Sequence, residues 1–247
     1  MTRRVDAVAV VIPAHDEEEL LGACLDSIAV AVLAARAVVD RVDVHVVLDA
    51  CRDGSARIAA AAEVTVTTID ARAVGVARSA GIARALSALP DHDLRHIWTA
   101  HTDADSVVPS NWITHQLLHA RRGADLVIGT VRPDFDDLTP EQTAAWWATH
   151  TPGAPNGHVH GANLGIRASA LVGVGGFPPA AAHEDVRVVE LIRRAGGRAV
   201  ATDAAWVRTS GRRQGRAPEG YARYLQEGLL ERAREIGAPE TREISLL

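Results

Sequence analysis

The segment "VAVVIPAHDEE" (8–18) decides the fold, because it joins a fully apolar run to a cluster of carboxylates. Its first part, "VAVVIP" (8–13), is short and rich in β-branched residues, which is typical of a buried strand in a parallel sheet. "DEEELLGACLDSIAVAVLAAR" (16–36) follows with an apolar stripe at helical spacing, and we expect its carboxylates to occupy the first turn of the helix. A strand followed at once by a helix is the repeating unit of α/β proteins.

The same alternation continues along the chain. Further strands are predicted at "VDVHVVLD" (42–49), "VTVTTI" (64–69), "HIWTA" (96–100) and "DLVIGTV" (125–131). Helices are predicted at "SARIAAAAE" (55–63), "GVARSAGIARALSAL" (75–89) and "NWITHQLLHARR" (111–122). Repeated units of this length predict a doubly wound α/β sheet with crossover helices on both faces.

Three acidic loops are expected at one edge of this sheet. Ligands of doubly wound sheets bind beyond the carboxyl ends of the strands, which places Pro13–Glu17, Asp49–Asp53 and Thr102–Asp105 along one rim. No G-x-G-x-x-G follows the first strand and no G-x-x-x-x-G-K-[ST] occurs, so dinucleotide-binding and P-loop interpretations lose their main support. A rim rich in Asp predicts instead that a diphosphate is held through Mg²⁺ or Mn²⁺.

The turn "HTDADS" (101–106) places two carboxylates, Asp103 and Asp105, one residue apart. A divalent cation would convert their mutual repulsion into ligation. Taken alone, the D-x-D pattern fits a solvated turn better, since Asp is common in turns. The surrounding acidic rim favours the metal.

Composition excludes several classes of protein. A chain of 247 residues with 47% hydrophobic content can bury one sizeable core, and its net charge of −5 argues against nucleic-acid binding. Cys24 and Cys51 lack metal-type spacing, which favours a reducing cytoplasm. The apolar run near the N-terminus breaks at Pro13 and is too short for export or a membrane span, which leaves only peripheral membrane contact open.

Six segments carry a resemblance to a known family. They are "VVIPAHDEEELLGACLDSI" (10–28), "VVLDACRDGS" (46–55), "GVARSAGIARAL" (75–86), "TDADS" (102–106), "GANLGIRASALVGVGGF" (161–177) and "HEDVRVVELIRRAGG" (183–197). In this order, from about Val8 to about Leu225, the sequence resembles the family 2 glycosyltransferases, which are inverting, nucleotide-sugar-dependent enzymes with the GT-A fold. It departs from the family pattern at Asp16 and Ser79, where Asn is more usual.

The resemblance implies an architecture and an activity. It implies a Rossmann-like GT-A domain with a doubly wound mixed sheet over residues 1–216, with a nucleotide-binding half at about 1–106 and an acceptor half at about 107–216. Residues 217–247 would form a helical tail. The implied enzyme is a metal-assisted hexosyltransferase that moves a sugar from a UDP- or GDP-sugar to an unknown acceptor hydroxyl, with inversion. It would be non-processive, because Gln214 is followed by Gly215 and Arg216 without the Trp of a Q-x-x-R-W motif.

The resemblance also implies roles for individual residues. Asp105 and Asp103 would hold Mg²⁺ or Mn²⁺, Asp185 would be the catalytic base, Glu184 would support it, and Asp49 would read the nucleotide base. The implied nucleotide and donor contacts are Pro13, Ala14, His15, Glu17, Asp49, Arg78, Asp103, Ala104, Gly161, Asn163, Arg213 and Arg216.

Several of these residues have a second interpretation. Asp49 could end a strand or cap the next helix, Glu184 and Asp185 could be first-turn helix charges, and Arg78 could lie on a helix surface. His158 and His160 are candidates for a third metal ligand or an acceptor contact, or are ordinary loop histidines.

Two other regions stay open in the same way. The cluster Arg212, Arg213 and Arg216 could close over a diphosphate, or be a solvated basic loop before the amphipathic helix "EGYARYLQEGLLERARE" (219–235). Trp146 and Trp147 could shape an acceptor pocket, although burial of one of them is expected.

Two other functions also remain open. A nucleotidyltransferase acting on a sugar phosphate would need a basic, glycine-rich loop after the first strand, and "PAHDEE" (13–18) is acidic instead. A non-catalytic nucleotide-sugar-binding protein would keep the acidic rim and would not need Asp185.

Overall fold

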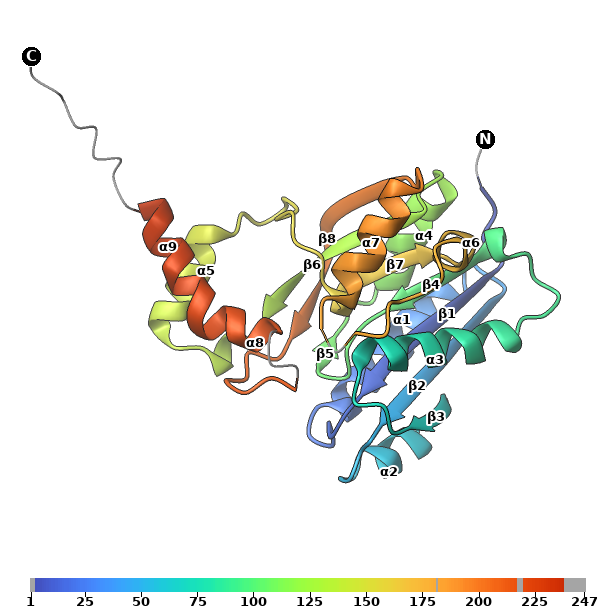
Figure 1. Cartoon of the computed structure of the whole chain (residues 1–247), viewed down its shortest axis with the longest axis horizontal. Helices are drawn as coiled ribbons and strands as arrows, with labels where there is room; N and C mark the ends of the chain where they lie inside the picture. Colours follow the sequence, from blue (N-terminus) through green and yellow to red (C-terminus); the bar gives the residue numbers. More distant parts are fainter. Residues whose placement is uncertain (1–2, 181, 217–219, 238–247) are drawn as a thin grey trace, which may run out of the picture.

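A computed structural model describes residues 3–180, 182–216 and 220–237 of the chain (Figure 1). Its strands are β1 (Ala7–Ala14), β2 (Arg41–Asp49), β3 (Thr65–Ile69), β4 (Ile97–His101), β5 (Ser106–Val107), β6 (Leu126–Pro133), β7 (Leu164–Arg167) and β8 (Ala199–Thr209). Its α-helices are α1 (Leu21–Ala35), α2 (Ser55–Ala60), α3 (Val74–Ser87), α4 (Trp112–Arg121), α5 (Pro140–Thr149), α6 (Ala168–Gly173), α7 (Glu184–Arg194), α8 (Tyr221–Arg223) and α9 (Leu229–Gly237). A π-helical turn, Tyr224–Gly228, joins α8 to α9.

The strands form one mixed sheet in the order β3-β2-β1-β4-β7-β6-β8-β5. The first four are parallel, β7 runs antiparallel to both β4 and β6, and β8 is parallel to β6. The five predicted strands are present, and the mixed α/β sheet expected from the resemblance is confirmed. The sequence pattern did not identify β7, β8 or the two-residue β5.

Helices cover both faces of the sheet, as predicted. Along β1, Val8, Val10 and Ile12 pack with α1 and α4 into the larger core, whereas Val11 belongs to the core under α3 and α7. Alternate side chains of a strand point to opposite faces, so a run that is apolar throughout supplies both cores at once.

The first helix begins later than predicted. It starts at Leu21 and carries no acidic residue in its first turn, so the expectation that the carboxylates of "DEEE" (16–19) lie in that turn is wrong. Two of these side chains bind the neighbouring loop instead, since Asp16 accepts a hydrogen bond from the Arg52 amide (2.7 Å) and Glu18 accepts one from the Gly54 amide (2.7 Å).

A small helical layer lies beyond the end of β6. Figure 1 shows α5 beside α8 and α9, away from the rest of the helices. Ala145 and Trp146 of α5 pack there against Leu225 and Leu229 in a separate apolar cluster. The predicted domain boundary after residue 216 stays a prediction, because residues 217–219 lie outside the described residues, as does the end of the predicted tail, 238–247.

Gly81 provides a test of the packing of α3 on the sheet. A Cβ at this position would lie 2.5 Å from Val11 Cγ1 and 2.9 Å from Val47 Cγ2. We expect Gly81→Ala to lower the free energy of unfolding by about 1–3 kcal/mol through overpacking, despite the better helix propensity of Ala.

Gly22 of α1 is the matched control, because a Cβ there meets no heavy atom within 4 Å. Gly22→Ala should raise the free energy of unfolding by up to about 1 kcal/mol. Urea unfolding of both variants measures the difference, and equal effects would contradict the close approach of α3 to β1 and β2.

Candidate functional site

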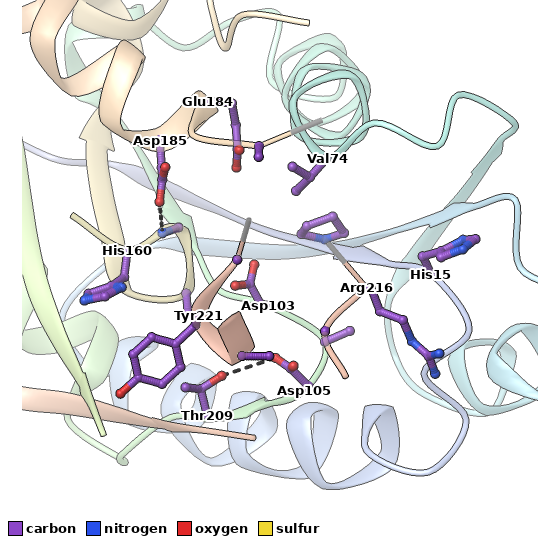
Figure 2. A pocket seen from close by; sticks show the side chains of 18 of the residues that line it. His15, Val74, Asp103, Asp105, His160, Glu184, Asp185, Thr209, Arg216 and Tyr221 are labelled. Atoms are coloured by element: carbon purple, nitrogen blue, oxygen red, sulfur yellow. Dashed lines mark hydrogen bonds between the residues drawn. The ribbon is translucent and has the colours of Figure 1, made fainter. Parts of the chain in front are cut away.

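A cavity of about 680 Å³ lies at the carboxyl ends of β1, β2 and β4. The parallel strands end there together, so their loops converge at this edge. The predicted site residues that line it are Pro13, Ala14, His15, Glu17, Asp49, Arg78, Asp103, Ala104, Asp105, Gly161, Glu184, Asp185 and Arg216. Figure 2 shows Asp103 and Asp105 in the middle of this cavity, with His15 and Arg216 toward one end and His160 and Tyr221 toward the other.

Asp105 lies at the floor of the cavity beside β8. Its Oδ1 accepts a hydrogen bond from the Thr209 hydroxyl (3.3 Å), and its Oδ2 lies 3.0 Å from Arg212 Nη2. Burial and the neighbouring Asp103 raise the pKa of Asp105 to about 6, although Arg212 opposes the shift. A positive charge next to Asp105 therefore stabilises its ionised form.

Arg212 supplies that positive charge. Its two terminal nitrogens donate to Glu17 Oε2 (2.8 Å) and Oε1 (2.7 Å), a bidentate contact, while Nη2 also reaches Asp105. Arg216 lies nearby, with Nε 3.6 Å from Glu17 Oε1. These contacts anchor the loop after β8 across the acidic rim, so Arg212 and Arg216 do not form a freely solvated basic loop.

Arg78 connects two walls of the cavity, the turn after β4 and the start of α7. Its side chain is only 1% exposed, which rules out the helix-surface interpretation. Nε donates to Glu184 Oε1 (3.0 Å) and Nη2 donates to Asp103 Oδ1 (2.5 Å). Burial disfavours its charge, but these two carboxylates outweigh that and raise the pKa of Arg78. A buried ion pair of this kind fixes geometry more than it adds stability.

Glu184 and Asp185 are the first residues of α7 and project toward the cavity (Figure 2). His183 precedes them in a left-handed conformation with φ of 59°, which turns the chain sharply into the helix. Asp185 Oδ2 accepts a hydrogen bond from the Gly161 amide (2.7 Å), and its Oδ1 accepts one from the Val186 amide (2.8 Å). Burial raises the pKa of both carboxyls, while Arg78 counteracts the shift.

Asp49 holds a loop in place at the end of the cavity where His15 lies. Its Oδ1 accepts from the amides of Ala71 (2.7 Å) and Arg72 (2.8 Å), and its Oδ2 accepts from the amide of Ala73 (2.9 Å). Asp49 is the last residue of β2, as one of its second interpretations expected, but the amides that it binds lead into α3 and it does not cap α2, the next helix along the chain. Asp16, where the family more often has Asn, has φ of 50°, a conformation that both residue types tolerate.

Two predicted donor contacts lie elsewhere. Asn163 is buried under β6 and β8, where its amide donates to Thr130 O and Ala205 O (both 2.9 Å) and its Oδ1 accepts from Trp112 Nε1 (2.9 Å). Both of its amide hydrogens and its Oδ1 bind core groups, and it does not line the cavity. Arg213 is exposed and also lies outside the cavity wall, whereas its neighbour Arg212 occupies that place.

The wall of the cavity opposite His15 contains His150, His158, His160, Tyr221 and Tyr224. His158 and His160 were candidates for a metal ligand or an acceptor contact, whereas the sequence did not point to His150, Tyr221 or Tyr224. Trp146 is buried behind this wall and Trp147 is stacked on Phe135 (5.2 Å between ring centroids), so neither Trp lines the cavity. A sequence signal for α5 was available in "TPEQ" (139–142), a capping box with Pro at the helix start.

His158 and His160 do not complete a metal site with Asp103 and Asp105. Within the described part of the chain, the only group of three metal-type side chains close together is Asp16, Cys51 and Asp53. Mg²⁺ and Mn²⁺ need only one or two protein carboxylates when substrate phosphates complete the coordination. The two neighbouring carboxylates of Asp103 and Asp105, each in contact with a guanidinium, fit such an ion.

Comparison with known families decides the classification. The model of the family described as "Glycosyl transferase family 2" matches residues 9–170, more than half of the chain. The chain belongs to glycosyl transferase family 2. A search of curated proteins finds no significant match.

Solved structures show that this family 2 glycosyltransferase has the GT-A fold. S. aureus TarS 1–349 with UDP-GlcNAc superposes with a TM-score of 0.63 at 12% identity, over 93% of this chain and 70% of that one. The mannosyltransferase PcManGT from Pyrobaculum calidifontis, solved with GDP-Man and Mn²⁺, gives 0.58 at 20% identity, over 93% and 73%. Glucosyl-3-phosphoglycerate synthase from Mycobacterium tuberculosis gives 0.53 at 16% identity, over 96% and 82%.

The glycosyltransferase is shorter than some of these proteins. It spans 36% of a longer TarS chain and 65% of TarS 1–349 in another structure. Over residues 3–180, 182–216 and 220–237, it has no helix long and apolar enough to cross a membrane.

His160 provides a test of the electrostatics of the wall opposite His15. Burial lowers its pKa to about 3, compared with about 6.5 in an unfolded chain. The unfolded chain therefore binds the proton first, and this residue makes the free energy of unfolding fall as pH drops from about 6.5 toward 3, by up to about 1.4 kcal/mol per pH unit.

We expect His160→Phe to remove this contribution. Urea unfolding of both proteins at about pH 7.5 and about pH 5 measures it, and the variant should lose less stability at the lower pH. Parallel losses in both proteins would show that His160 is not held neutral by the fold.

Proposed function

We propose that this glycosyltransferase transfers a hexose from a nucleoside-diphosphate sugar to an acceptor hydroxyl, with inversion and with the aid of a divalent cation. The observation that carries the proposal is one cavity with the Asp103–Asp105 pair in its middle and Asp185 on the opposite wall (Figure 2). The pair suits a cation bound to a diphosphate, and Asp185 suits a base.

Structural neighbours support a nucleotide-sugar donor. TarS was solved with UDP-GlcNAc and PcManGT with GDP-Man and Mn²⁺, and both share the fold around this cavity. We therefore infer a UDP- or GDP-sugar as donor and Mg²⁺ or Mn²⁺ as the ion.

Asp105 would be the principal metal ligand and Asp103 the second. When bound, the cation would neutralise charge that develops on the leaving diphosphate. In the structure, Arg212 Nη2 lies 3.0 Å from Asp105 Oδ2. We propose that Arg212 and Arg216 turn to the diphosphate when donor and cation enter, because a guanidinium binds phosphate oxygens as readily as carboxylates.

Asp185 would accept the proton of the acceptor hydroxyl. The hydroxyl oxygen attacks the anomeric carbon as the bond from that carbon to the diphosphate oxygen breaks on the opposite face, and the configuration inverts. The raised pKa of Asp185, caused mainly by burial, makes its carboxylate a better base. The amides of Gly161 and Val186 orient it, and Glu184 is tied to Arg78 in a supporting role.

The end of the cavity away from Asp185 would hold the nucleoside. It is lined by Pro13 and Ala14 at the end of β1 and by His15 after them. Asp49 Oδ2 accepts a hydrogen bond from the Ala73 amide and retains a lone pair that suits the imide N–H of a nucleobase.

Gln214 and Arg216 lie in a loop without the aromatic residue of processive enzymes, so we propose transfer of one sugar at a time. Free thiols at Cys24 and Cys51 are consistent with our proposal of a cytoplasmic enzyme.

The metal site is tested by Asp105→Asn. The amide keeps the shape of the side chain but is a poor ligand, so the gain in UDP affinity that Mn²⁺ provides should fall by at least about tenfold. Calorimetric titration of UDP with and without Mn²⁺ measures this gain.

Asp53→Asn is the matched control. Asp53 lies with Asp16 and Cys51 in the other group of metal-type side chains and does not line the cavity. Loss of the Mn²⁺ effect in Asp53→Asn, with retention in Asp105→Asn, would move the metal away from Asp105.

The catalytic base is tested by Asp185→Asn. The variant keeps the size of the side chain, can accept only one of the two amide hydrogen bonds of Asp185 and cannot take a proton, so sugar transfer, or slow hydrolysis of the donor by water, should fall by about 10²- to 10⁴-fold. UDP affinity should change little, because the metal ligands are intact. Glu190→Gln is the control on the exposed face of the same helix, where Glu190 pairs only loosely with Arg194 (3.7 Å). A wild-type rate in Asp185→Asn would make Glu184 the next candidate.

A further inference from the structure

The end of the cavity nearest Asp185 has a wall with no ionised side chain. His150, His158, His160, Tyr221 and Tyr224 form it, and we call it the aromatic wall. The acidic and Arg residues of the cavity come from elsewhere, namely the ends and following loops of β1, β2, β3 and β4, helices α3 and α7, and the segment after β8. Figure 2 shows His160 and Tyr221 on the same side of the cavity as Asp185 and on the opposite side of Asp103 from His15.

The rings of the aromatic wall are held in place by one another. His160 meets Tyr221 edge-on (5.6 Å between centroids), and Tyr221 stacks with Tyr224 (5.8 Å). Trp146 supports both sides of the wall from behind, since it stacks on His150 (4.2 Å) and its Nε1 donates to the Tyr221 hydroxyl (3.4 Å). The wall is therefore a packed, preformed surface and not a set of mobile loop side chains.

A π-helical turn gives the wall its shape. Residues Tyr224–Gly228 form this turn, and α8 immediately before it carries Tyr221. The buried side chain of Gln142 in α5 donates to Leu225 O (3.0 Å), which holds the irregular turn against α5. π-helical turns are rare and occur frequently at functional sites.

The wall offers ring faces and polar tips without charge. Burial lowers the pKa of His150, His158 and His160, so all three are neutral near pH 7. Arg232 contacts His158 Nε2 (3.0 Å) but does not line the cavity. A phosphate or carboxylate placed here would lose water without gaining a cation, which is costly.

We propose that the aromatic wall is the acceptor subsite and that it binds a neutral sugar ring, such as an uncharged glycoside. This inference rests on the proposed function. A sugar ring has an apolar C–H face that packs on aromatic rings and hydroxyls that bond with Tyr and His tips. The Gly161 amide that holds Asp185 follows His160 directly in the chain, so a sugar bound on the wall has its hydroxyls beside the proposed base.

Binding of simple sugars tests the proposal. With UDP and Mn²⁺ present, the full chain is titrated with methyl glucoside, methyl mannoside and methyl N-acetylglucosaminide, and with the 6-phosphates of the same sugars and 3-phosphoglycerate. Ligand-observed NMR gives each Kd. We expect at least one neutral glycoside to bind, and the phosphorylated compounds to bind at least about tenfold more weakly.

Variants of the wall connect that binding to the structure. Tyr221→Leu and Tyr224→Leu should each raise the Kd of the glycoside about fivefold or more, whereas Tyr221→Phe, which keeps the ring, should retain most of the binding. Trp147→Leu, which removes an exposed ring outside the cavity, is the control and should have no effect. Thermal melting identifies any variant that fails to fold, and the Tyr224 variant then decides.

Three results would overturn the proposal. These are preference for the phosphorylated compounds, glycoside binding unchanged in both Leu variants, or loss of UDP affinity in the Leu variants, which would assign the wall to the nucleobase. Failure of the proposed function is seen separately, as absence of Mn²⁺-dependent UDP or GDP binding before any sugar is added.

Discussion

The buried guanidinium of Arg78 is the contact on which the geometry of the cavity depends. It lies between Glu184 at the start of α7 (3.0 Å) and Asp103 after β4 (2.5 Å), with almost no exposure to solvent. Without it, two carboxylates from distant parts of the chain would face each other, and burial would drive Glu184 toward its protonated form. Because charge interactions strengthen as water is excluded, one residue can set the spacing between the acidic turn and the helix that carries Asp185.

Arg212 has the same function at the open side of the cavity. Its bidentate contact with Glu17 and its contact with Asp105 bring the end of β8 over the loop after β1. Arg78 is enclosed and Arg212 is a quarter exposed. Of the two contacts, that of Arg212 is therefore the one that a ligand entering from solvent can reach.

The topology of the fold explains why charged and aromatic residues lie in different parts of the cavity. The parallel half of the sheet supplies Glu17, Asp49, Asp103 and Asp105, because its strands all end at the same edge. The antiparallel strand β7 reverses the chain and lets the segment from Gly161 reach Asp185 from the other side. The helical layer of α5, α8 and α9 then closes the uncharged end with aromatic rings. In the proposed reaction the leaving diphosphate needs charged groups beside it, whereas the acceptor hydroxyl needs a site from which water is excluded. A cavity with separate charged and aromatic ends suits both.

Local pattern predicted some elements and not others for a physical reason. Strands β1, β2, β4 and β6 are buried on both faces and read as apolar runs, whereas β7 has four residues and β8 alternates buried and exposed positions around Asp203. The start of α1 was predicted too early because acidic residues favour a first helical turn, and here they found amide donors in the loop at 52–55. The resemblance implied Asn163 and Arg213 as donor contacts, but a side chain's direction depends on the element that carries it, and neither side chain lines the cavity.

The sequence alone determined the alternating strands and helices, the acidic rim and the family, because these follow from apolar runs and from short motifs whose residues are adjacent in the chain. Only the tertiary structure decided which charges meet. Arg78 and Glu184 are 106 residues apart and Arg212 and Glu17 are 195 apart, and no local pattern specifies such pairs. The aromatic wall was also decided by packing, since His160 and Tyr221 share a surface only after α5 and the π-helical turn enclose Trp146. Periodicity tells which side of an element is buried, whereas the identity of the neighbour across a cavity depends on how distant elements pack.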